Sequence, residues 1–62
     1  MSNDELLTPE EVAQRLRVGR TKVYELMDRG DLPSIKIDRC RRIPSRGVDA
    51  FIARKLEEAA HA

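Results

Sequence analysis

Residues 18–30, which read Val-Gly-Arg-Thr-Lys-Val-Tyr-Glu-Leu-Met-Asp-Arg-Gly, decide the fold of this 62-residue chain. Val23, Leu26 and Met27 recur at positions i, i+3 and i+4, which is the spacing of the buried face of a short helix. The two glycines suit the helix ends, the first as an N-cap and the second in the left-handed conformation after the last turn. The stretch therefore predicts a short helix with one face in the core and the opposite face exposed.

The charges on this helix are placed unfavourably for its own dipole. Arg20 and Lys22 lie at the positive N-terminal end, and Asp28 lies near the negative C-terminal end. A local rule broken without a local benefit is typical of a functional site. We therefore interpret the N-terminal cations as groups that contact phosphates and base edges. Glu25, on the same exposed face, either accepts a hydrogen bond from a cytosine or, as we favour, pairs with Arg29 four residues later.

Another helix is predicted just upstream. Residues 8–11, Thr-Pro-Glu-Glu, form a capping box with proline at the first helical position, which marks a helix start. Val12, Ala13 and Leu16 share its buried face, and the helix should end near Arg17. Only two residues then separate the two helices, so together they predict a helix-turn-helix.

A β-hairpin, or wing, is predicted downstream over residues 34–44. Its first four residues alternate polar and apolar side chains, as a half-buried strand does, and a four-residue turn and a short return strand follow. A two-stranded hairpin is marginal alone. Ile35, Ile37 and Ile43 are therefore expected to pack on the helices.

A third helix is expected after the wing. Ser45 suits its N-cap, and its apolar stripe consists of Val48, Phe51, Ile52 and Leu56. Beyond this stripe the helical pattern fades.

The predicted fold is mainly α with a small β-hairpin, in the order helix-helix-strand-strand-helix, which is a winged helix-turn-helix. The domain is expected to cover residues 6–56, with a flexible N-terminus at residues 1–5 and a fraying C-terminal tail at residues 57–62.

The net charge of +1 conceals an uneven distribution of charge along the chain. Residues 1–14 carry four acidic residues and no basic ones, whereas residues 15–46 carry ten Lys and Arg against four acidic residues. Residues 47–62 are slightly acidic again. A basic module between two acidic ends favours a nucleic-acid partner.

The sequence argues against several other classes of protein. Cys40 is the only cysteine and has no histidine near it in sequence, so neither a disulfide nor a metal site is expected. The chain has no cofactor-binding motif and no nucleophile–histidine arrangement, so it is not expected to be an enzyme. Without an apolar run long enough to span a membrane, or a secretory signal, it is expected to be cytoplasmic and associated with DNA.

The order of several short motifs resembles a known family. The motifs are Leu-Thr-Pro-Glu-Glu-Val-Ala at 7–13, Val-x-x-x-x-Val-Tyr-x-Leu-Met at 18–27, Gly-x-Leu-Pro at 30–33 and Arg-Ile-Pro at 42–44. In this order they resemble the excisionase-type helix-turn-helix, a small winged relative of the MerR DNA-binding domain. The resemblance covers about residues 6–54.

The resemblance implies that the second helix enters a major groove of double-stranded DNA while the wing tip reaches an adjacent minor groove. It further implies an excisionase, a recombination directionality factor that binds and bends attachment-site DNA to promote integrase-mediated excision. The alternative is a small transcriptional regulator of the AlpA or MerR kind. An integrase would be a partner, and several copies are expected to bind side by side because one 62-residue chain covers little DNA.

The resemblance also identifies candidate DNA contacts at matching positions. The matching residues are Arg20, Thr21 and Tyr24 in the recognition helix and Arg39 and Arg41 at the wing tip. Arg42 matches the family's recurrent arginine before Ile-Pro. Three positions depart from the family pattern: Gly19 replaces a usual serine, Asp38 a usual glycine, and Arg41 a common aromatic residue. With the chemistry of the neighbouring lysines included, the predicted DNA contacts are Arg20, Thr21, Lys22 and Tyr24 in the recognition helix and Lys36, Arg39, Arg41 and Arg42 in the wing.

The chemistry of these residues suggests different roles. Arg20 is expected to pair with a guanine and Lys22 to meet a phosphate. Tyr24 is left open between a DNA contact and packing against the edge of the core. A protein-interaction module that binds a partner through the helix over residues 48–56 is the remaining alternative. A steep loss of affinity for DNA with salt would distinguish a DNA binder from such a module.

Overall fold

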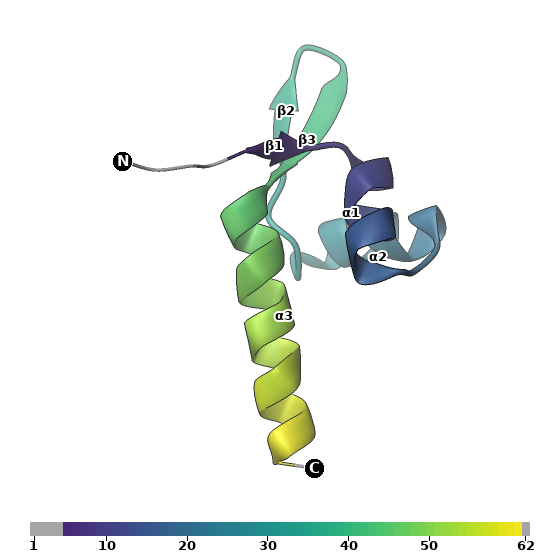
Figure 1. Cartoon of the computed structure of the whole chain (residues 1–62). Helices are drawn as coiled ribbons and strands as arrows, with labels where there is room; N and C mark the ends of the chain where they lie inside the picture. Colours follow the sequence, from purple (N-terminus) through teal and green to yellow (C-terminus); the bar gives the residue numbers. More distant parts are fainter. Residues whose placement is uncertain (1–4, 62) are drawn as a thin grey trace.

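The computed structural model describes residues 5–61 and contains three helices and three short strands in this part of the chain. The elements in chain order are β1 (Leu6–Leu7), α1 (Pro9–Leu16), α2 (Arg20–Arg29), β2 (Ile35–Ile37), β3 (Cys40–Pro44) and α3 (Ser45–Ala60). The predicted order helix-helix-strand-strand-helix is confirmed, and β1 is an addition that precedes it. The hairpin turn and the C-terminal end of α3 lie at opposite ends of the molecule (Figure 1).

Three of the four helix ends in the helix-turn-helix are capped locally, while Gly19 at the start of α2 is an N-cap without a side-chain hydrogen bond. The capping box at the start of α1 is confirmed, with Thr8 Oγ1 accepting from the amide of Glu11 at 3.0 Å and Glu11 Oε1 accepting from the amide of Thr8 at 2.9 Å. Arg17 ends α1 in the left-handed conformation with φ 57°. Gly30 ends α2 in the same region with φ 84°, as the sequence predicts, and donates to carbonyls of the last turn.

The start of α3 is capped differently from the prediction. Pro44 is the N-cap, and Ser45 is already the first helical residue. Ser45 binds the N-terminal segment instead: its amide donates to the carbonyl of Glu5 at 2.8 Å, and its Oγ accepts from the amide of Glu5 at 3.2 Å. These bonds continue the β1–β3 pairing and place Glu5 beside the start of α3. The flexibility of residues 1–5 stays a prediction, and residues 1–4 lie outside the described residues.

The three strands form an antiparallel sheet in the order β1-β3-β2. Ile35 lies opposite Arg42, and Ile37 lies opposite Cys40. Directly opposed residues share a face of the sheet, and side chains alternate along a strand. Ile43 therefore lies on the other face from Ile35 and Ile37.

This register corrects the prediction that all three isoleucines pack on the helices. Ile43 is 0% exposed, as predicted, but Ile35 and Ile37 are each 47% exposed on the outer face of the sheet. Lys36 of β2, and Ser34 just before this strand, lie on the inner face instead. The hairpin turn is also shorter than predicted, because Cys40 and Arg41 already belong to β3. The turn consists of Asp38, with φ 55°, and Arg39.

The core lies between the helices and the inner face of the sheet. Its buried members are Leu7, Val12, Ala13, Val23, Leu26, Met27, Leu32, Ile43, Val48 and Phe51. The predicted stripe of α2 is confirmed, since Val23, Leu26 and Met27 are all buried. Gly47 lets α3 approach closely, because a Cβ at this position would overlap the ring of Pro33.

The predicted stripe of α3 is only half buried. Val48 and Phe51 reach the core, but Ile52 is 38% exposed and Leu56 is 66% exposed, which corrects their assignment to the core. The C-terminal turns of α3 extend past the body of the domain, and none of the other helices and strands described within residues 5–61 covers them (Figure 1). The prediction that residues 57–62 fray stays a prediction, and α3 itself continues to Ala60.

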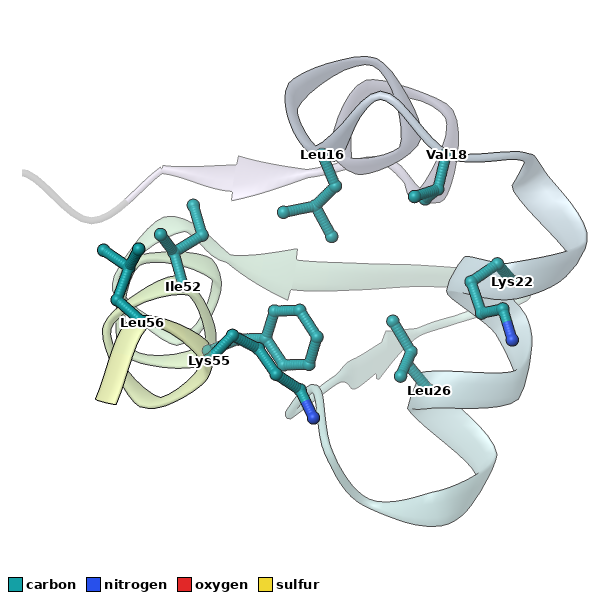
Figure 2. A pocket seen from close by; sticks show the side chains of 8 residues that line it. Leu16, Val18, Lys22, Leu26, Ile52, Lys55 and Leu56 are labelled. Carbon is teal, nitrogen blue, oxygen red and sulfur yellow. The ribbon is translucent and has the colours of Figure 1, made fainter. Parts of the chain in front are cut away.

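An open apolar groove of about 460 Å³ results between α3 and the helix-turn-helix. Figure 2 shows Leu16 and Val18 along one side, Lys22 and Leu26 from α2 along another, and side chains of α3 opposite them. The α3 residues that line it are Phe51, Ile52, Lys55 and Leu56. On the α3 side, the groove is lined by the exposed part of the apolar stripe, Ile52 and Leu56.

Candidate nucleic-acid interface

The recognition helix α2 presents the four predicted contact residues to solvent. Its buried stripe holds the helix against α1 and the core, so the opposite face points outward. Arg20, Thr21 and Lys22 are exposed in the first turn. Tyr24 is 37% exposed, which leaves part of its ring on the protein and part of it accessible. A short helix with one exposed basic end has the dimensions to enter a major groove.

Two of these cations are already paired with carboxylates. Arg20 Nη1 lies 3.3 Å from Glu10 Oε2 in the first turn of α1. Lys22 Nζ lies 3.2 Å from Glu25 Oε1 within α2. The predicted pair between Glu25 and Arg29 is therefore wrong. Lys22 is three residues from Glu25 in sequence, whereas Arg29 is four residues away.

Arg29 instead binds Asp31 just beyond the helix end, at 2.8 Å from Nη2 to Oδ2. Arg54 of α3 approaches the same carboxylate at 3.8 Å and donates to the carbonyl of Asp31 at 3.2 Å. The Arg29 hydrogen bond is the largest influence on the pKa of Asp31, and together with the nearby cations it lowers that pKa from its ordinary value of 3.8 despite partial desolvation. Asp31 thus joins the end of α2 to α3.

Replacing Asp31 with asparagine is expected to lower the thermal unfolding midpoint at neutral pH. A carboxyl whose pKa is depressed in the folded state adds stability above its unfolded pKa, and that stability is lost as pH falls through the folded pKa. The difference between the parent and Asp31→Asn should therefore shrink as pH falls through the lowered pKa of the folded state, and it should vanish once the Asp31 carboxyl is protonated. Thermal melts followed by circular dichroism from neutral to acidic pH test this, and a difference that persists in acid would contradict it.

In the wing, Arg41 and Lys36 lie on the same face of the sheet as buried Ile43, the face turned toward α2. Arg41 Nη1 lies 3.6 Å from Asp28 Oδ1 in the last turn of α2, and its Nη2 donates to Ser34 Oγ at 3.4 Å. The structure therefore brings Arg41 to the recognition helix itself, with 37% of its side chain exposed. Lys36, directly opposite Arg41, is exposed beside it.

The other two predicted wing residues lie elsewhere on the hairpin. Arg39 is exposed in the turn, and within residues 5–61 it makes no hydrogen bond or ion pair. Arg42 lies on the outer face of the sheet, opposite Ile35, and its guanidinium donates to the carbonyl of Arg41 at 3.0 Å. The structure thus brings Lys36 and Arg41 toward the recognition helix, leaves Arg39 at the tip, and places Arg42 on the far face.

Two carboxylate neighbours of these cations, Glu10 and Asp28, are missing from the predicted site. Each pairs with an arginine predicted to bind DNA, and each is separated from that arginine by ten or more residues in sequence. The unfavourable positions of Arg20 and Asp28 on the helix dipole were the available signal. Their partners on other elements account for part of that mismatch.

The interface offers cations and hydrogen-bond donors. The described residues contain no group of three or more metal-binding side chains. Cys40 is exposed in β3. Among residues 5–61, no helix is both long enough and apolar enough to cross a membrane.

Comparison with known proteins gives consistent matches over most of the chain. Residues 6–56 match the family of helix-turn-helix domains. An excisionase of Streptomyces ambofaciens is 54% identical over 55 residues, which cover 89% of each chain. A protein of Saccharopolyspora erythraea named as a probable excisionase is 43% identical over 58 residues, covering 94% of this chain and 59% of its own length. No solved structure is a significant match.

Proposed function

Because the chain belongs to the excisionase-type family of helix-turn-helix DNA-binding proteins, we propose that it acts as a recombination directionality factor. In this role it binds attachment-site DNA, bends it, and promotes excision by an integrase. The observation that carries the proposal is the 54% identity to an excisionase across 89% of both chains. The exposed basic face of α2 beside a basic wing supports it.

The proposed DNA contacts divide between the recognition helix and the wing. In α2, Arg20 and Thr21 read bases, Lys22 contacts a phosphate, and Tyr24 contacts DNA through the exposed part of its side chain. In the wing, Lys36, Arg39, Arg41 and Arg42 supply backbone contacts, with Arg39 entering the neighbouring minor groove. Because α2 also exposes Glu25 and Asp28, much of the affinity comes from the wing and the choice of sequence from the helix.

The proposed partners are double-stranded DNA, an integrase, and further copies of the chain bound side by side. The protein works in the cytoplasm on DNA and catalyses no reaction itself. Bending brings the integrase sites together, which is a contribution that a small non-enzymatic protein can make by deforming DNA.

An excision assay tests the proposal. The purified protein is added to the integrase encoded nearest to its gene and to a plasmid that carries the two attachment sites of the element. We expect excision to depend on the protein, a retarded complex with attachment-site DNA, and a bend by circular permutation. Specific binding and bending without excision would favour the transcriptional regulator, and no retarded complex at low salt would refute DNA binding.

A further inference from the structure

Two ion pairs link the recognition helix to its neighbours through arginines proposed to bind DNA. Arg20 pairs with Glu10 of α1, and Arg41 pairs with Asp28 of α2. We propose that Glu10 and Asp28 are specificity-determining residues. Each carboxylate pairs with its arginine and competes with phosphates that lie at an unfavourable distance. A DNA group with matching geometry displaces the carboxylate and binds the arginine. This inference rests on the proposed DNA-binding function.

The positions of the pairs make such a role possible. Glu10 and Arg20 come from the first turns of two different helices, while Asp28 and Arg41 come from the last turn of α2 and from β3. Each pair therefore lies at one end of the recognition helix. Ser34 Oγ also accepts from Arg41, so this guanidinium is held by two groups.

Solvent exposure allows both pairs to exchange partners. The side chains are 65% and 54% exposed for Arg20 and Glu10, and 37% and 71% exposed for Arg41 and Asp28. Ion pairs this accessible to water are weak, because water and salt screen them. A partner with matching geometry can therefore displace the carboxylate.

Arg39 provides the contrast within the same interface. It lies in the exposed turn of the wing, and no carboxylate pairs with it among residues 5–61. A free arginine attracts any phosphate, whatever the sequence. Within residues 5–61, the interface thus combines a wing-tip cation without a carboxylate partner and two cations held at the ends of α2.

Pairing of an arginine with a carboxylate favours selectivity between DNA sequences. A phosphate at a poor distance competes badly with a carboxylate already in place, so a held arginine adds little to binding of unrelated DNA. A guanine edge or a well-placed phosphate offers two parallel hydrogen bonds, which exceed a single contact with the carboxylate. Holding the arginine therefore lowers the affinity for wrong sites more than the affinity for the right one.

The test compares Asp28→Asn with the parent on two short duplexes, one of mixed sequence and one enriched by selection from a random pool. We expect Asp28→Asn to tighten binding to the mixed duplex about three- to tenfold. The plot of log affinity against log salt concentration should become steeper by about 0.9, the value for one additional phosphate contact. Binding to the selected duplex should change less, so the ratio of the two affinities falls. Glu10→Gln is expected to act in the same direction through Arg20.

A matched control separates this effect from a general loss of negative charge. Asp49→Asn removes an exposed carboxylate from α3 and should leave the ratio of affinities unchanged. The decisive variant is Asp28→Asn in an Arg41→Gln background, where the effect on mixed DNA should fall below about twofold. Because Asp28 is 71% exposed, circular dichroism should show that these variants remain folded.

Three outcomes would overturn the inference: no tightening by Asp28→Asn, the same tightening without Arg41, or equal tightening on both duplexes. An effect of Asp49→Asn as large as that of Asp28→Asn would overturn it as well. Failure of the parent to bind any duplex is a separate result, because it refutes the proposed function rather than the role of Glu10 and Asp28.

Discussion

Replacing Ile43 with alanine is expected to lower the free energy of unfolding by about 2–5 kcal/mol, whereas Ile37→Ala should cost less than about 1 kcal/mol. Both residues are isoleucines of the same hairpin, but Ile43 is 0% exposed and Ile37 is 47% exposed. The first substitution leaves a cavity in the core beside Leu7, its partner across β1 and β3. The second removes methyl groups that already contact water.

Urea unfolding followed by circular dichroism measures both changes. A core of this size rarely supplies more than about 3–5 kcal/mol, so a large fraction of the Ile43→Ala protein should be unfolded without denaturant. Ile35→Ala, at the other exposed position on β2, serves as the second control. Equal losses for Ile43 and Ile37 would mean that the outer face of the sheet is also covered in solution.

The sequence predicts the two faces of the hairpin but not which face meets the core. Alternation places Ile35 and Ile37 together, and a shift of pairing by one residue changes which side chains join them. The actual register sets these residues opposite Arg42 and Cys40, on the face away from Ile43. That register depends on the two-residue turn and on β1, a strand of only two residues that carries no periodic signal.

The helix-turn-helix was predictable because its determinants are local. The capping box, the glycine after α2 and the spacing of three apolar residues each act within a few positions of one another. The apolar stripe of α3 has an equally regular helical spacing, but only Val48 and Phe51 of its four residues are buried. What covers a stripe is a tertiary property, and the domain is too small to cover Ile52 and Leu56.

For the candidate interface, the sequence predicts which helix carries the exposed cations, and the structure adds how they are held. Pairs such as Arg41 with Asp28 join residues 13 positions apart on different elements. No helical or strand spacing relates such residues, so only the fold reveals them. The pair predicted from helical spacing, Glu25 with Arg29, is the one that failed, since Lys22 and Asp31 compete for these side chains.

Replacing Arg20 with alanine is expected to weaken binding to the selected duplex by about 1–3 kcal/mol, or about 5- to 150-fold, and to relax the preference at one base position. A bidentate contact with guanine carries sequence information, so its loss should affect mixed duplex much less. Arg39→Ala at the wing tip should instead weaken both duplexes alike and reduce the salt slope by about 0.9. Affinities from fluorescence anisotropy at several salt concentrations, with selection repeated for each variant, measure these effects.

The partner of Arg20 needs its own control. Arg20→Ala leaves Glu10 as an unpaired carboxylate near the DNA, and that carboxylate repels phosphate on any sequence. The double variant Arg20→Ala with Glu10→Gln removes this repulsion, so it should recover part of the affinity for mixed duplex but not the lost base preference. If the base preference is unchanged in both variants, Arg20 does not read a base, and α2 must select its site through Thr21 or Tyr24 instead.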